Sequence, residues 1–367
     1  MFLPQSEKLN ITAFSNLFKD TSACYKFFWF NAVIRKIISG ADSATFDELV
    51  NEMIAEAWYM VSEYHLNLSS VTDNVEQAVN RLSEISGFKS SEKREKILKF
   101  LSETDDKELH KIKLTLILNV PYRLQAPLLD GFKGNTWDVR PADLAERINA
   151  QRQRLIYYFD AFCGLETRIF FREEWVRYII ENQTIIEGWL QFNLVEYLQR
   201  KNPNVPGIIE KLHAPEARDL ERVKEYWKLI SAVHPVNEIY KGELLDAKGI
   251  SIDHFVPWSY VANDEFWNLH PTTRNINSSK GNHLPDWDIY FESFSEMEYL
   301  AYSLRNENDS LKAAYRRCMD KHLNSEDVRS SLYAEELERN VFCERLENIV
   351  RPVYQSAQNA GFSLWTA

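Results

Sequence analysis

Residues 250–286 read ISIDHFVPWSYVANDEFWNLHPTTRNINSSKGNHLPD and decide how the chain is interpreted. The stretch opens with a short β-like run that ends in the pair Asp253-His254, and it is then rich in Asn, Ser and Thr. Amide side chains are poor helix formers and poor core material, so their density here calls for a local role. Because successive side chains of a strand point to opposite faces, Asp253 and His254 are free to serve different partners.

The residue types in this stretch suit metal-assisted hydrolysis. Carboxylate and amide oxygens are ligands for a hard cation such as magnesium, which makes Asp253 and Asn277 candidates. Histidine titrates near neutral pH, so His254 is a candidate to take a proton from water. Lys280 is a candidate phosphate contact. The alternative is structural: His254 is a core histidine and NINSSKGN (residues 275–282) is only a turn.

Residues 239–285 resemble the HNH endonuclease motif of the ββα-metal kind, and in motif they are closest to the HNH domain of the type II CRISPR effector nucleases. The upstream run EIYKGELL (residues 238–245) is similar to the first hairpin strand of such domains. The shared residues follow one gapless register: Asp253, His254, Pro257, Ser259, Asp264, Asn268, Asn277, Lys280 and Pro285.

The resemblance implies specific roles. His254 is the general base, and Asp253 and Asn277 hold one magnesium ion, for which manganese can substitute. Asn268 hydrogen-bonds the backbone around His254. Lys280 and His283 are the candidate substrate contacts.

The chain departs from many HNH domains in two respects. The last residue of the motif is often His, whereas the register here gives Asn277, with His283 six residues later. The chain also has no CxxC pair, so no structural zinc is expected and the hairpin must be braced by surrounding helices. His270 has no counterpart in the family and is interpreted as structural or surface.

Composition indicates a globular protein with an acidic surface. The 367 residues are 45% hydrophobic and carry a net charge of −11, which disfavours a protein that binds nucleic acid over its whole surface. Residues 241–286 themselves hold four Lys or Arg and six Asp or Glu. Binding to DNA must therefore depend on residues outside 241–286, or on a local basic patch.

One candidate for binding DNA is an arginine-rich region interleaved with aromatic residues. The alternative, an ordinary ion-paired helix surface, is favoured on pattern grounds. The region comprises Arg140, Arg147, Arg152, Arg154, Arg168, Arg172 and Arg177, with Tyr157, Tyr158, Phe170 and Phe171.

The sequence predicts a mainly α fold. Two helices are expected within 21–65, the second starting at a capping box of Thr45 and Glu48, and helices again over 74–120, 143–200 and 287–362. A hairpin is expected from residues 238–245 and 250–255. The expected domains are a helical region at 1–232 that subdivides near 120–142, the nuclease module at 233–290, and a helical segment at 291–367.

These observations predict a cytoplasmic, metal-dependent DNA endonuclease that acts as the effector of a bacterial restriction or anti-phage defence system. No signal peptide or membrane span is expected, and no disulfide framework. The helical region is expected to dock a protein partner or a second copy of the chain. The alternatives are a non-cleaving HNH-fold module that binds nucleic acid or protein, and RNA as the substrate.

Overall fold

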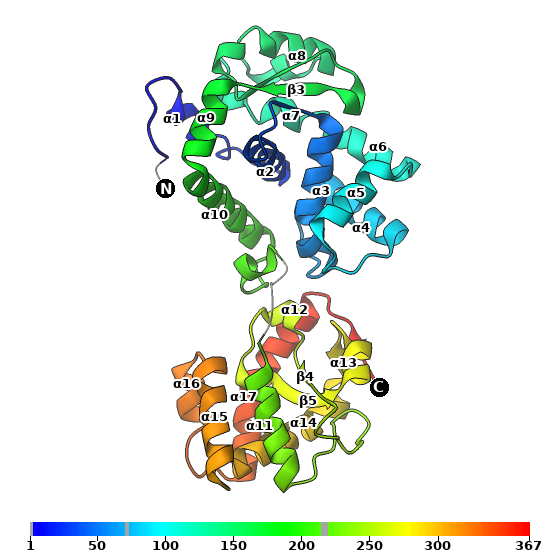
Figure 1. Ribbon diagram of the computed structural model, residues 1–367, viewed down its shortest axis with the longest axis vertical. Coiled ribbons are helices and arrows are strands. Elements are labelled where there is room, and N and C mark those ends of the chain that lie inside the picture. The colour runs from blue at the N-terminus through cyan, green and yellow to red at the C-terminus, as the bar shows by residue number, and fades with distance from the viewer. Residues whose placement is uncertain (1–2, 70–72, 214–218) are drawn as a thin grey trace. The chain divides into compact units, whose positions relative to one another are not determined.

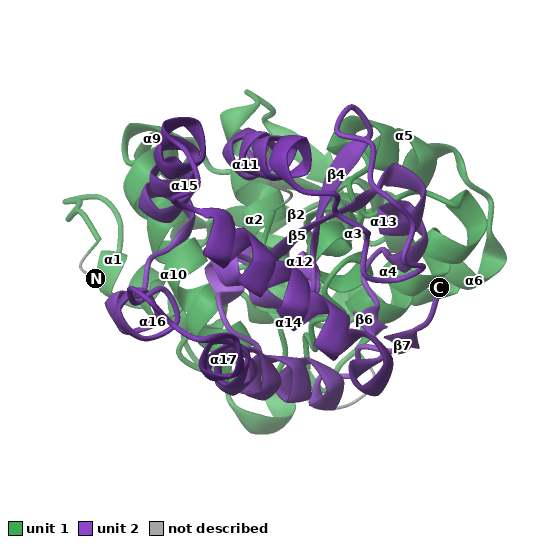
Figure 2. Cartoon of the chain, turned by 90° about the horizontal axis from the view of Figure 1, so that it is seen from below, with its two compact units in different colours: residues 1–203, 211–214 green, residues 204–210, 215–367 purple. Residues whose placement is uncertain are grey.

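The computed structural model describes residues 3–69, 73–213 and 219–367, and the fold is mainly α (Figure 1). This confirms the fold class predicted from the sequence. Contacts divide the chain into two compact units, coloured separately in Figure 2. Unit 1 is residues 1–203 with 211–214, and unit 2 is residues 204–210 with 215–367. Over the described ranges, no helix combines the length and apolar character that a membrane crossing requires.

Unit 1 is a helical body around α2 and α3. As predicted, α3 begins at a capping box, in which Thr45 Oγ1 accepts from the Glu48 N–H and the Glu48 carboxylate accepts from the Thr45 N–H. Its helices are α1 Ile11–Ser15, α2 Tyr25–Ile38, α3 Phe46–Ser62, α4 Asn74–Ser86, α5 Arg94–Glu103, α6 Lys107–Leu116, α7 Val120–Arg123, α8 Pro141–Asn149, α9 Glu173–Glu181 and α10 Gln183–Lys201.

Unit 1 also contains a small antiparallel sheet that the sequence did not predict. Its order is β1–β3–β2, with β1 Ser43–Thr45, β2 Tyr157–Phe159 and β3 Arg168–Phe171. The prediction of helix throughout 143–200 is therefore wrong between α8 and α9. Strands of three or four residues are too short to show an alternating pattern, and the pairing of β3 with β1 depends on a distant part of the chain.

Unit 2 surrounds a two-stranded hairpin with helices. The hairpin strands are contacted by α11, α13 and α14 (Figure 1). The elements are α11 Glu221–Val233, β4 Ile250–His254, α12 Trp258–Val261, β5 Leu269–Thr273, α13 Arg274–Lys280, β6 Leu284–Pro285, α14 Trp287–Leu304, α15 Asp309–His322, α16 Glu326–Ser331, α17 Arg339–Asn359 and β7 Leu364–Trp365.

The hairpin differs from the predicted one. Residues 238–245 do not pair with 250–255; they form a turn closed by a single bridge between Asn237 and Leu244, and β4 pairs with β5 instead. The Glu238 carboxylate accepts backbone N–H groups within this turn, including that of Tyr240 at 2.8 Å, and Gly242 has φ 71°. Local hydrogen bonding to a carboxylate thus competes with strand pairing.

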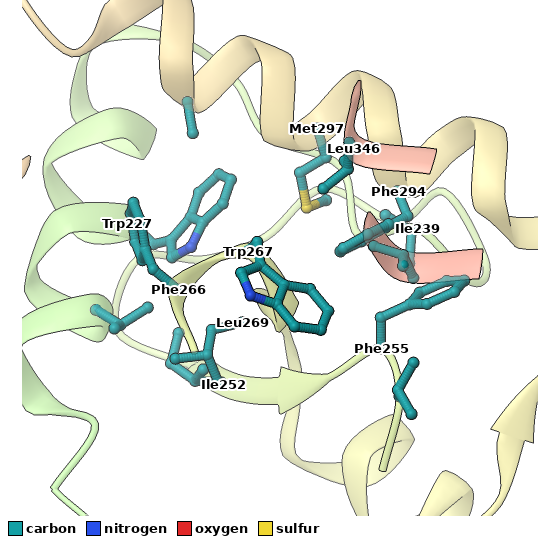
Figure 3. Packing of buried hydrophobic residues seen from close by; sticks show 14 of the residues in the cluster. Trp227, Ile239, Ile252, Phe255, Phe266, Trp267, Leu269, Phe294, Met297 and Leu346 are labelled. Carbon is teal, nitrogen blue, oxygen red and sulfur yellow. The ribbon is translucent and has the colours of Figure 1, made fainter. Parts of the chain in front are cut away.

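The core of unit 2 packs both faces of the hairpin against the helices. Figure 3 shows the central side chains, and Phe255 stacks on Phe294 with ring centroids 4.3 Å apart. The labelled residues are Trp227, Ile239, Ile252, Phe255, Phe266, Trp267, Leu269, Phe294, Met297 and Leu346. This packing holds the strand that carries Asp253 and His254.

Candidate functional site

Asp253 and His254 are the last two residues of β4. In the antiparallel register Asp253 lies opposite His270 and His254 opposite Leu269. Both site residues are nearly enclosed, with exposed fractions of 5% and 4%. A buried carboxylate requires a compensating charge or hydrogen bonds, so the partners of Asp253 define the site.

Asn268 clamps the chain directly after the pair. Its Oδ1 accepts from the Val256 N–H and its Nδ2 donates to the Val256 carbonyl, both at 2.8 Å. The Phe255 N–H donates to the backbone carbonyl of Asn268 at 3.0 Å. The fully buried amide therefore fixes the β4–β5 connection two residues beyond His254.

Lys280 is the counter-charge of Asp253. Its Nζ lies 3.3 Å from Oδ1 and 3.1 Å from Oδ2 of the carboxylate, and it donates to the His254 carbonyl at 2.8 Å. Burial raises the pKa of Asp253, but the charge of Lys280 outweighs burial and leaves this pKa below its ordinary value. The Lys280 side chain is fully buried, so here it neutralises Asp253 instead of facing solvent.

Tyr240 is a partner of Asp253 to which the sequence assigned no role. Its buried hydroxyl donates to Asp253 Oδ2 at 3.1 Å. His270 Nε2 lies 3.9 Å from the same oxygen, and burial lowers the pKa of His270 to about 3, so that ring is neutral. His270 is completely buried, which agrees with a structural interpretation. The sequence feature that could have indicated a role for Tyr240 is its place in the run EIYKGELL (residues 238–245), which is similar to the first hairpin strand of HNH domains.

His254 is oriented by Asp264. Its Nε2 lies 2.8 Å from Asp264 Oδ1, and the backbone carbonyl of Asp264 lies 3.1 Å from His322 Nδ1. A carboxylate that accepts from one ring nitrogen fixes the orientation of the imidazole. Asp264 belongs to the shared motif residues, but only the structure shows its partner.

Asn277 lies on α13 against the same strand. Its Nδ2 donates to Ser251 Oγ at 3.0 Å and to the Ile252 carbonyl at 2.9 Å. These bonds use both N–H groups of the amide and leave its Oδ1 as the atom that can ligate a cation. Asn277 and Lys280, both on α13, thus meet β4 at consecutive positions.

His283 lies apart from these contacts. It is exposed, and its Nδ1 is 2.7 Å from Ser363 Oγ. There β7 pairs in parallel with β6, and Trp365 packs edge-on against Tyr240 with ring centroids 5.0 Å apart. The segment after α17 therefore supports the site through the contact of Trp365 with Tyr240, in addition to the support that the helices give.

The arginine-rich candidate region shows the features of an ion-paired surface. Tyr157 is buried and Tyr158 stacks on Phe170 within the sheet of unit 1, so these rings serve packing. Carboxylate partners are found for several of the arginines: Arg140 with Asp143, Arg154 with Asp130, Arg172 with Glu174 and Arg177 with Glu173.

The donor set of the site fits magnesium in chemical type. Asp253 on β4 offers a carboxylate, and Asn277 on α13 offers an amide oxygen. Among the described residues no three His, Cys, Asp or Glu side chains gather in a metal-holding group. Magnesium commonly takes only one or two protein carboxylates and completes its shell with water and substrate phosphate. A cation here would share Asp253 with Lys280.

Comparison with known proteins bears on the same region. Residues 236–286 match the family model described as HNH endonuclease. Searches of curated proteins and of solved structures gave no match. The matched range contains the turn with Tyr240, the β4–β5 hairpin and α13, which are the elements that assemble the site. The part of the chain that assembles the site is therefore the part that is similar to HNH endonucleases.

Proposed function

We propose that the chain is a metal-dependent endonuclease that hydrolyses DNA phosphodiester bonds at the site formed by β4 and α13. The observation that supports the proposal lies within the matched range. Asp253 and His254 end β4, Asn277 of α13 bonds the Ile252 carbonyl of the same strand, and Asp264 holds His254 at 2.8 Å. A carboxylate, an amide oxygen and an oriented imidazole are the groups that such hydrolysis requires.

His254 acts as the general base in this proposal. When Asp264 accepts from Nε2–H, Nδ1 is the ring nitrogen that takes the proton of the attacking water, and Asp264 stabilises the resulting imidazolium. Asn268 positions His254 by fixing the backbone that follows it. Asp253 and Asn277 would hold a magnesium or manganese ion, which when bound supplies charge stabilisation at the phosphate.

The wider role rests on analogy. HNH domains joined to helical regions suggest a cytoplasmic effector of bacterial restriction or anti-phage defence, with unit 1 receiving a partner or a second copy of the chain. Lys280 and His283 stay candidates for substrate contacts, Lys280 only if the pair with Asp253 opens.

A second candidate is a non-cleaving module that binds nucleic acid or protein. The observation in its favour is that Asp253 is enclosed and already neutralised by Lys280. RNA is the alternative substrate of a cleaving enzyme, since DNA and RNA offer the same phosphodiester group to a cation and a general base.

Metal dependence of cleavage separates the two candidates. Purified protein is incubated with supercoiled plasmid in magnesium, in manganese and in EDTA, and in parallel with a structured RNA. The proposal predicts nicked or linear DNA with either metal and none in EDTA. Cleavage that persists in EDTA contradicts the metal dependence, RNA cleavage alone reassigns the substrate, and no cleavage of either favours the binding module.

A further inference from the structure

Three cationic side chains from separate segments line one groove beside β4. Lys224 comes from α11, Lys248 from the turn before β4, and Arg274 from the start of α13. The groove has a volume of about 580 Å³, and its lining also includes Ser251 and a single carboxylate, that of Glu221. Three cations thus face one anion.

These three cations have no ion-pair partner over the described ranges. Other cations of the unit do have one. The pairs are Lys280 with Asp253, Arg317 with Glu225, Lys321 with Asp219, Arg329 with Glu326, Arg339 with Glu296 and Arg351 with Glu347. Unpaired cations that share a groove create a local positive potential.

The acidic residues of the surrounding motif do not cancel that potential fully, because several are engaged elsewhere. Asp253 is neutralised by Lys280, and Asp264 lies against His254. The Glu265 carboxylate is buried and accepts from Asn324. Asp246 is the nearest acidic residue in sequence and caps the turn through the Lys248 N–H. The motif is acidic in sum but presents a cationic groove.

The groove adjoins the candidate site. Ser251 lines it, and the Ser251 hydroxyl accepts from the Asn277 amide at 3.0 Å. Ser251 precedes Asp253 by two residues on β4, a rise of about 7 Å. Arg274 and Asn277 are three residues apart on α13 and so share one face of that helix. A strand with one phosphate at the site therefore reaches the groove within one or two nucleotides.

We propose that this groove binds the phosphodiester backbone beside the bond to be cut, with Lys224, Lys248 and Arg274 contacting neighbouring phosphates. The proposal rests on the proposed nuclease function and names the substrate contact that an acidic protein otherwise lacks. Arginine and lysine contacts to phosphate carry no base information, so the groove positions the strand without reading its sequence. Duplex DNA is the expected occupant.

The test compares two double variants that each remove one lysine and one arginine. Lys248→Gln/Arg274→Gln removes two of the three positive charges of the groove. Lys312→Gln/Arg316→Gln instead changes exposed positions of α15 outside the groove. Binding of a fluorescent DNA duplex, and of an RNA duplex of the same sequence, is followed by anisotropy in EDTA at several salt concentrations. The slope of log K against log salt should fall by about 1.8 in the groove variant and stay unchanged in the control.

Lys224→Gln alone should lower that slope by about 0.9, which provides a second, independent variant. Equal slopes and affinities for wild type and the groove variants, or no binding by wild type at low salt, would overturn the proposal. If the groove variants lose affinity for the RNA duplex alone, DNA is not the occupant of the groove. Because binding is measured without metal, the two proposals can fail separately. If the groove variants lower the salt slope but wild type leaves plasmid intact, only the nuclease function is contradicted. If wild type cleaves plasmid but the groove variants leave the slope unchanged, only the groove proposal is contradicted.

Discussion

Asp253 is a buried carboxylate whose neighbours determine what it can do. Lys280 balances its charge, and the Tyr240 hydroxyl donates to one of its oxygens. Removing one member of a buried ion pair leaves the other charge uncompensated, which costs about 3–5 kcal/mol in typical proteins. Lys280 is therefore a determinant of the local fold as well as a candidate substrate contact.

Glu298 is a second buried carboxylate, but one without such a partner. It lies on α14 in the core of unit 2, and its Oε1 has no hydrogen-bond partner among the described residues. Burial raises the pKa of Glu298 well above its ordinary value of 4.5, so the folded protein keeps this side chain protonated where the unfolded chain ionises it. Its contribution to stability is full below about pH 4.5 and is lost as pH rises toward the folded pKa.

Glu298→Gln should remove this pH dependence. The difference in the free energy of unfolding, variant minus wild type, should rise by up to about 1.4 kcal/mol per pH unit between about pH 5 and pH 7, because wild type alone loses stability over this range. Urea denaturation at both pH values measures the difference. Glu292→Gln, an exposed position of the same helix, should show no such rise. A constant difference between Glu298→Gln and wild type at both pH values would contradict the assignment.

The β4–β5 connection is the element on which the site depends, and Asn268 is its clamp. Asn268→Ala leaves the N–H and the carbonyl of Val256 without their partners inside the protein. Each buried polar group left unpaired costs about 1–3 kcal/mol, so we expect a loss of about 2–4 kcal/mol in the free energy of unfolding.

The matched control lies in the same connection. Asn263 is exposed, and Asn263→Ala should change stability by less than about 0.5 kcal/mol. Chemical denaturation of the two variants beside wild type measures both values. If the two substitutions cost the same, the clamp is not what fixes the chain after His254.

Local sequence signals predicted some elements and not others. The capping box of Thr45 and Glu48 gave the start of α3, because both partners lie within one turn. Residues 238–245 have strand-like composition, yet Glu238 draws them into a turn, and the strand that pairs with β4 is β5, fifteen or more residues further on. The residues of the site could be proposed from one stretch, whereas the Tyr240–Asp253, Lys280–Asp253 and Asp264–His254 contacts needed the folded chain.

At the scale of the whole molecule, charge and division into units bear on function. Each unit has its own internal contacts, and the range that matches the HNH endonuclease model lies within unit 2, together with α11 and the helices that follow the range. A net charge of −11 makes the average surface repel phosphate, so binding of nucleic acid depends on local features such as the groove beside β4. This favours an enzyme whose contact with DNA is confined to the site.

The rate of plasmid cleavage by His254→Ala tests the central claim most directly. The measurement is the initial rate with saturating magnesium for wild type, His254→Ala and His110→Ala, the last at an exposed position of α6. Loss of a general base lowers the rate by about 10²–10⁴-fold, so we predict such a drop for His254→Ala and a change below about twofold for His110→Ala. Equal rates for the two variants would contradict the account, because cleavage would then not use the imidazole at the end of β4.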